Sequence, residues 1–451
     1  MKKFVLMIAP FNTRSGYGDH ARSIFYSIMN REDLDIKCID VKWGNTPRNH
    51  LNPKVPRHKK LLDTFVDGNN IKQQPDVLID IRIPNEFAGG AKVNIGITAG
   101  VETDVVSAEF LHGMNKMDLN IVPSEFTAAT FRQCKYDQMQ DLPDGQKQKI
   151  GDIKLDKPIK VLFEGVDTDV YYPKEKYQLK KEDPILYGEL DSLIKEKSAF
   201  LHVGQWGGKG EDDRKNIALL IKLFLKTFAN LPNKPALVLK TSGANFSILD
   251  KHEICSRIKK IKGDFDGVDI PNIYLIHGDL TINEMSTLYN HPKIKAFVTL
   301  THGEGFGRPM LEASCCDLPI IASKWSGQLD FLTDSESLLI SGFLKEVPKS
   351  VLWPPIIIEP SKWFNVNEGD VVRKLRTFHK KEKIITKKAK RLSSKNRRNM
   401  SLKKMAEKFN KILDDVLQGI PQPIALNLPK LKKVTKDKDT KIKLPKLKKV
   451  T

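Results

Sequence analysis

Residues 301–313 read THGEGFGRPMLEA and follow an apolar run. Gly303, Gly305 and Gly307 permit a tight turn and the close approach of a ligand to the backbone. Pro309 suits the first turn of a helix. The stretch therefore predicts a strand, a glycine loop and an exposed helix N-terminus, which together form a physical site for a diphosphate.

Two carboxylates frame this stretch. Glu304 and Glu312 are eight residues apart, so one lies in the loop while the other projects from the helix, and both reach a single elongated ligand. The spacing of the glycines does not fit GxGxxG, and the chain has no strong Walker pattern. Simple dinucleotide and ATP sites are therefore disfavoured.

Short apolar runs alternate with helix-like stretches in both halves of the chain, which predicts parallel sheets covered on both faces. In the first half the predicted strands are Phe4–Ala9, Ile36–Val41, Val77–Ile81, Val93–Ile97 and Leu119–Val122. In the second half they are Ala199–Val203, Ala236–Lys240, Ile273–Ile276, Ala296–Thr299 and Pro319–Ala322. Helices are expected at Asn216–Ala229, Thr281–Asn290, Met310–Cys316 and Ser401–Leu417.

The predicted fold class is therefore α/β, with two doubly wound, Rossmann-like domains facing across a cleft. A C-terminal helix and a basic tail follow them. The expected boundaries are an N-terminal domain at 1–175, a connector at 176–198, a C-terminal domain at 199–400, the helix at 401–418 and a Lys-rich, disordered tail at 419–451.

Composition places the chain among folded proteins of a reducing compartment. It is 40% hydrophobic and 29% charged, and no run of 18 apolar residues suggests a membrane span. The apolar start reads as a buried strand because no cleavage pattern follows it, so a cytoplasmic location is expected. The five scattered cysteines lack a CxxC pair, which argues against a disulfide framework and a zinc site.

The net charge of +20 is unevenly distributed. Residues 371–451 hold 27 Lys+Arg and 6 Asp+Glu, while residues 1–370 are nearly neutral. The excess therefore predicts a property of the final segment only, and its candidate partners are a nucleic acid or an anionic membrane surface. A merely solvated extension is an equal alternative.

The segment 304–313 resembles the retaining glycosyltransferases of the GT-B fold, particularly glycosyltransferase family 4, whose hallmark is E-x7-E in an E-G-F-G-x-P-x-x-E-A context. Three further stretches resemble that group's motifs in the expected order, and the resemblance covers roughly residues 1–335. They are Ser15-Gly16-Tyr17-Gly18, Gly165-Val166-Asp167 through Pro173, and Arg214-Lys215-Asn216.

The resemblance implies a nucleotide-sugar donor, UDP- or GDP-linked, with no tightly bound cofactor and no required metal. Arg214 and Lys215 would neutralise the donor diphosphate, and Glu304 would lie near the transferred sugar. Glu312 would accept hydrogen bonds from the ribose. The expected donor contacts also include the backbone of four glycines and a phenylalanine, which are Gly16, Gly18, Gly305, Phe306 and Gly307.

The acceptor side is less defined. Glu102 resembles a segment that lines the acceptor side in some relatives, and His20 and His112 are further candidates. Many relatives carry an arginine where Gln205 follows Val203-Gly204, which leaves the phosphate geometry open. Three readings therefore remain: a retaining hexosyltransferase-like enzyme with an unidentified acceptor, the same enzyme directed to nucleic acid by its tail, or a non-catalytic protein that binds sugar nucleotides or glycans.

Overall fold

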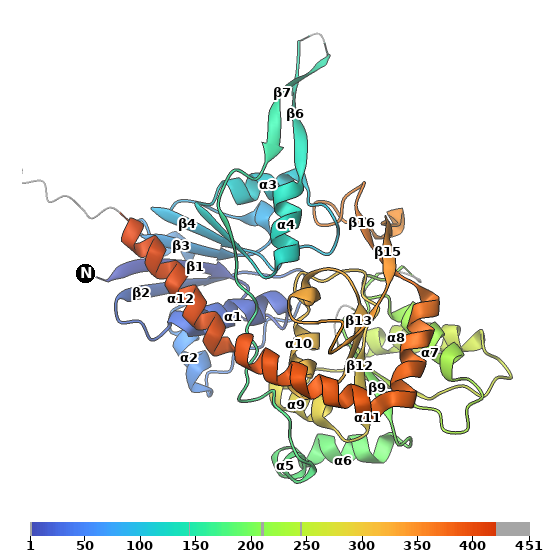
Figure 1. Ribbon diagram of the computed structural model, residues 1–451. Coiled ribbons are helices and arrows are strands. Elements are labelled where there is room, and N and C mark those ends of the chain that lie inside the picture. The colour runs from blue at the N-terminus through green and yellow to red at the C-terminus, as the bar shows by residue number, and fades with distance from the viewer. Residues whose placement is uncertain (1, 144, 209–211, 244–245, 421–451) are drawn as a thin grey trace, which may run out of the picture.

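The computed structural model describes residues 2–143, 145–208, 212–243 and 246–420, which form two α/β domains (Figure 1). The first contains a six-stranded, wholly parallel sheet in the order β2-β1-β3-β4-β5-β8. Its strands are β1 (Lys3–Ala9), β2 (Leu34–Asp40), β3 (Val77–Ile81), β4 (Val93–Ile97), β5 (Leu119–Val122) and β8 (Ile159–Val161).

The second domain repeats the design, with parallel strands in the order β11-β10-β9-β12-β13-β14. They are β9 (Ala199–Val203), β10 (Ala236–Lys240), β11 (Ile273–Ile276), β12 (Ile294–Val298), β13 (Ile320–Ser323) and β14 (Leu338–Ile340). Apart from the half-buried β11, these strands are almost wholly buried, which explains why they appear as plain apolar runs in the sequence. The predicted α/β class with two Rossmann-like domains is confirmed.

Helices cover both sheets. Those before the second sheet are α1 (Gly16–Ile28), α2 (Pro56–Leu62), α3 (Ala108–Asn115), α4 (Glu125–Gln133), α5 (Lys176–Glu182) and α6 (Pro184–Leu193). The later ones are α7 (Ile217–Phe228), α8 (Ile248–Gly263), α9 (Ile282–Asn290), α10 (Arg308–Cys315), α11 (Glu368–Asn399) and α12 (Leu402–Gly419). The segment 176–198, expected as a connector, thus contains two helices, and α6 packs on α9.

Two antiparallel hairpins form two-stranded sheets of their own beside the parallel sheets, and they were not predicted. One pairs β6 (Lys135–Asp141) with β7 (Lys147–Lys154) and stands clear of the first domain (Figure 1). The other pairs β15 (Gly342–Glu346) with β16 (Lys362–Val366) beside the first domain. The β16 end is fixed there because the Lys362 amide donates to Asp104 Oδ1 at 2.6 Å.

The chain crosses between the domains twice, at one place. The Val166 amide donates to Met400 O at 2.9 Å, and the Leu402 amide donates back to Val166 O at 2.8 Å. A Cβ on Gly165 would lie 2.7 Å from Leu402 Cα, so only glycine permits this approach. The two passages between the domains therefore run side by side.

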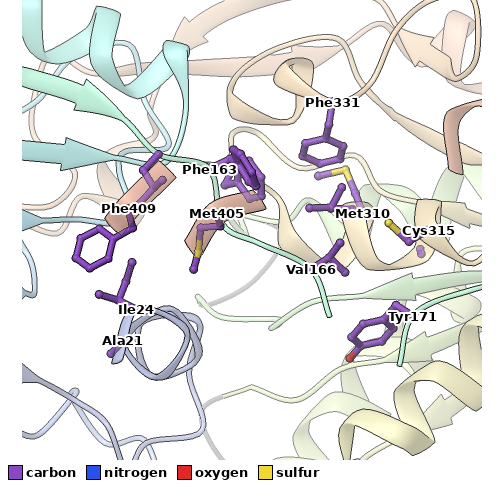
Figure 2. Close-up of a cluster of buried hydrophobic side chains, with 14 of the residues drawn as sticks. Ala21, Ile24, Phe163, Val166, Tyr171, Met310, Cys315, Phe331, Met405 and Phe409 are labelled. Carbon is purple, nitrogen blue, oxygen red and sulfur yellow. The ribbon is translucent and has the colours of Figure 1, made fainter. Parts of the chain in front are cut away.

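The last helix returns to the first domain. Ser401 caps α12, which packs against α1. The buried side chains of Met405, Phe409 and Leu413 on α12 belong to the same hydrophobic core as buried residues of α1. Figure 2 shows the side chains of Phe409 and Met405 near those of Ile24 and Ala21. The predicted helix at 401–418 is therefore part of the first domain's packing.

The distribution of charge corrects the sequence-based expectation for the final segment. Of the 27 Lys+Arg in residues 371–451, 17 lie at positions 371–420, which form most of α11 and α12. The other 10 fall in residues 421–451, outside the described residues. Most of the basic excess is thus carried by ordered helices. Within the described ranges, no helix combines the length and apolar character needed to cross a bilayer.

Candidate functional site

The strand order of the second sheet brings its two most informative loops together. The chain builds β9, β10 and β11 in one direction and then places β12 on the other side of β9. The loops that leave β9 and β12 therefore separate at the carboxyl edge, which is the switch point where ligands bind in open α/β sheets. Arg214 and Lys215 lie on the first loop, and Glu304 lies on the second.

The cationic pair is held by the start of α7. The buried carboxylate of Asp213 accepts hydrogen bonds from the Ile217 amide at 3.0 and 2.9 Å and from the Ala218 amide at 3.2 Å. These bonds satisfy amides that a helix start leaves unpaired. Asn216 then turns the backbone with φ of 56°. Arg214 and Lys215 are thereby fixed in front of the helix N-terminus.

The loop after β13 fixes Glu304. The Glu304 amide donates to Ser326 Oγ at 2.9 Å, and Glu304 O accepts from the Gly327 amide at 2.9 Å. Ser326 is itself oriented by Gln328, whose Oε1 lies 2.9 Å from Ser326 Oγ. Gln328 is fully buried and donates to Ser323 O at 3.1 Å. The glutamate is therefore supported by packed polar groups.

Four charged side chains meet at this edge. Lys215 Nζ lies 2.6 Å from Glu304 Oε1 and 3.6 Å from Glu102 Oε1. Arg214 Nη1 pairs with the same Glu102 oxygen. Because Glu102 follows β4 of the first domain, the network joins the two domains. The structure thus brings together three predicted donor-site residues and one predicted acceptor-side residue.

Burial and mutual charge shift the protonation of this network. Burial and the charge of Arg214 lower the pKa of Lys215 to about 8, against the opposing effect of Glu304. Burial tends to raise the pKa of Glu304, but Lys215 and Arg214 outweigh it and hold that pKa below its usual value. At neutral pH the pair is an ammonium facing a carboxylate.

The glycines of residues 303–307 serve a close approach between domains. A Cβ on Gly303 would lie 2.2 Å from Glu102 O, and one on Gly305 would lie 2.0 Å from Ala99 O. Gly307 has φ of 95°, which favours glycine, and caps α10. The Phe306 side chain is buried against Phe331, so its backbone amide is what remains for a ligand.

Glu312 lies in a second charged cluster rather than free for a ligand. Its Oε1 accepts from Arg308 Nε at 3.0 Å, and its Oε2 lies 3.4 Å from Tyr289 Oη. Burial raises the pKa of Glu312 to about 7, although Arg308 opposes the shift. Burial likewise raises the pKa of Glu164 to about 7, again against the opposing charge of Arg308. Sequence reasoning missed Arg308 and Glu164.

A signal for Arg308 was present in the sequence. It occupies the first turn of α10, where a helix dipole disfavours a cation unless carboxylates compensate. Here Asp19, Glu312 and Glu164 raise the pKa of Arg308 further, in opposition to burial. A cation at this position therefore indicates an acidic cluster around it.

The first turns of α1 supply the other side of this cluster. His20 is buried, and burial together with the charge of Arg308 lowers its pKa to about 3, so the ring is neutral. A Cβ on Gly18 would lie 2.5 Å from Thr13 O, so Gly18 is needed for packing. A Cβ on Gly16 would meet nothing within 4 Å, which leaves the first residue of α1 open to a ligand.

Two expectations fall elsewhere. His112 lies exposed on α3, which packs against β7 and the 84–86 turn, away from the charged network. Gln205, which replaces the arginine of many relatives, donates from Nε2 to Gly243 O and so braces the loops after β9 and β10. Among the described residues, no three His, Cys, Asp or Glu side chains converge as a metal site.

Part of the second domain matches a known family model. Residues 212–351 match the family model described as "Glycosyl transferases group 1". No curated protein is significantly similar in sequence. The matched 140 of 451 residues contain Arg214, Lys215, Glu304 and Glu312.

Three solved structures share the fold over nearly the whole chain. Sucrose-phosphate synthase from Thermosynechococcus elongatus is 13% identical, with a TM-score of 0.62 and coverage of 92% of this chain and 100% of that one. HepE of Anabaena in complex with UDP-glucose is 12% identical, with a TM-score of 0.58 and coverage of 91% of this chain and 99% of that one. A glycosyltransferase from Rickettsia africae is 13% identical, with a TM-score of 0.59 and coverage of 93% of this chain and 99% of that one. The fold is therefore GT-B, and fold and family match together support a glycosyltransferase.

Proposed function

We propose that this protein is a retaining glycosyltransferase that moves a sugar from a UDP- or GDP-linked donor to an acceptor. The observation that carries the proposal is the meeting of Arg214, Lys215 and Glu304 at the switch point of the second sheet. The N-terminus of α10, one residue beyond Gly307, faces the same edge. This combination suits a diphosphate leaving group.

The cations act where charge develops. As the bond between the anomeric carbon and the diphosphate breaks, negative charge grows on the leaving oxygen and positive charge on the sugar. Arg214 and Lys215 are already oriented and partly desolvated, so they stabilise the growing negative charge with little reorganisation. Glu304, beside Lys215, is placed to contact the sugar. A ribose hydroxyl would share Glu312 with Arg308 and Tyr289, which already pair with its two oxygens.

The first domain competes for the same cations. Glu102 supplies the carboxylate that now faces Arg214 and Lys215, so a diphosphate must displace it. Since Glu102 belongs to the other domain, donor entry requires the two domains to separate locally. Glu102 is then returned to the acceptor side when the donor is in place.

The donor is best sought first among UDP-sugars, because HepE, which shares the fold, is described in complex with UDP-glucose.

The cationic pair also supplies the charge neutralisation for which other transferases use a divalent ion. We therefore expect transfer to proceed unchanged in EDTA.

The test is donor turnover by the full chain, with product configuration read by NMR. Lys215→Ala and Glu304→Ala should each lower kcat/KM by about 10²- to 10³-fold, as for loss of one preorganised electrostatic partner. Lys222→Ala is the matched control, because Lys222 lies exposed on the adjoining helix α7 and should leave turnover intact.

Three results would each overturn part of the proposal. Unchanged turnover in both site variants would remove the cationic pair and its carboxylate from the mechanism. Calorimetric binding of nucleotide sugars without any turnover would instead favour a non-catalytic binding protein on the same fold. An inverted anomer in the product would reject the retaining mechanism alone.

A further inference from the structure

Helix α11 carries a continuous cationic face. Its 32 residues contain 13 Lys+Arg and 3 Asp+Glu. Six basic residues recur at steps of three, four or seven, so they share one side of the helix. We call this set the basic stripe, and it consists of Arg376, Lys380, Lys383, Lys387, Arg391 and Arg398.

The stripe points outward. All six side chains are exposed, whereas Leu375, Phe378, Ile385 and Leu392 on the opposite face are buried. The front of Figure 1 shows α11 lying across the near side of the molecule. The acidic residues of the helix lie off the stripe, with Asp370 paired to Arg373 and Glu382 paired to Lys295.

The charges of the stripe are uncompensated within the described structure. None of the six forms an ion pair with another described residue. Like charges at this spacing destabilise a helix, so the sequence maintains them against a cost. A partner with many negative charges would relieve that repulsion.

A cationic hollow adjoins the stripe. The helix departs from helical geometry at Lys381, where φ is −123° and ψ is 26°. Beside this kink lies a shallow hollow of about 380 Å³, and its basic lining comes from Arg373, Arg376, Lys380 and Lys381. Four cations around one concavity suit a phosphate-bearing headgroup.

We propose that the basic stripe docks on an anionic lipid surface. The stripe spans about 33 Å at 1.5 Å per residue, close to a full turn of duplex DNA. Along that length the phosphates of a duplex wind around its axis and face only part of the stripe, whereas a lipid surface can face every member. No aromatic side chain lies on the stripe for base stacking. Ile384, 59% exposed beside it, suits the headgroup boundary.

The inference does not depend on the proposed transfer reaction and is tested by binding alone. The full chain is mixed with vesicles of phosphatidylcholine, with and without phosphatidylserine, at physiological ionic strength, and bound protein is measured by flotation. Binding should require phosphatidylserine and weaken with salt. Replacing Lys383, Lys387, Arg391 and Arg398 together by glutamine should lower the partition coefficient about fivefold per removed charge.

Two matched variants isolate the stripe. The control Lys54→Gln, Lys72→Gln, Lys116→Gln and Lys157→Gln removes the same charge from exposed sites of the first domain and should bind like the parent. Lys383→Arg with Lys387→Arg should also bind normally. Thermal melting of each variant reports that the fold is intact.

Three outcomes would overturn the inference. One is equal loss of binding in the stripe and control variants, and another is parental binding in the stripe variant. The third is the absence of vesicle binding together with tight, stripe-dependent binding of duplex DNA, which would make the stripe a nucleic-acid surface.

Discussion

Lys215 illustrates how one residue ties the site to pH. Its pKa is lowered to about 8, so the ammonium that faces Glu304 is lost as the pH rises through that value. If the charged form stabilises the leaving diphosphate, kcat/KM should fall about tenfold per pH unit above 8. Lys215→Arg keeps the charge at all these pH values. It should lower the rate but flatten the alkaline limb, and a limb that persists would assign the titration to another group.

Glu102 allows a second prediction at this scale. Replacing it by glutamine removes the carboxylate that faces Arg214 and Lys215, so UDP should bind up to about fivefold more tightly, the usual limit for a partly exposed ion pair. Calorimetry of UDP binding measures the change. Glu109→Gln, at an exposed position of α3, is the control. Weaker binding in the Glu102 variant would show that this carboxylate assists the donor.

At this scale the roles assigned from the sequence stay predictions, and most of the contacts were not predicted. The E-x7-E spacing singled out Glu304 and Glu312, but the i,i+4 pair of Glu312 with Arg308 within α10 also interacts with the charge of Asp19 on α1, a neighbour that the sequence did not indicate. Likewise, Gly303 and Gly305 were predicted for a ligand, yet the backbone of the first domain occupies the space beside them. Such contacts involve residues about 200 positions apart and leave no local pattern.

The crossing of the two interdomain passages gives a prediction at the scale of elements. Gly165→Ala would place a methyl group 2.7 Å from Leu402 Cα and 3.0 Å from Leu402 N. Because these are backbone atoms, the passages must move apart, and we expect a loss of about 1–3 kcal/mol in the free energy of unfolding. Urea denaturation measures it.

Gly188 provides the matched control. It lies exposed in α6, and a Cβ there would meet nothing within 4 Å. Gly188→Ala should therefore be neutral or stabilising by about 0.5–1 kcal/mol, since alanine favours a helix interior. Equal destabilisation by both substitutions would mean that the crossing imposes no special demand for glycine.

Regular elements were predicted where burial was two-sided. Six strands have the bounds expected from their apolar runs, among them Val77–Ile81, Val93–Ile97 and Ala236–Lys240. The β6–β7 hairpin was not predicted because most of its side chains are exposed and polar. Helix α11 was not predicted because many lysines separate its buried residues in the sequence.

At the scale of the whole molecule, the C-terminal helix α12 packs on the first domain, which gives a further prediction. A chain ending at Met400 lacks the side chains of α12 that pack on α1, including Phe409 and Met405. Hydrogen exchange should therefore accelerate in α1, almost 400 residues away in sequence, while α7 stays protected. A chain ending at Ile420 retains α12 and is the control. Unchanged exchange in α1 would show that α12 contributes little to the first domain.

The adjacency of Gly165 and Leu402 has a mechanical consequence. Both covalent links between the halves pass through one point, so the halves are tied as by a single pivot, and relative movement there is chiefly rotation. Sliding of one half along the other would stretch both links at once. Opening at the charged edge would thus be repeated along the same path in every catalytic cycle.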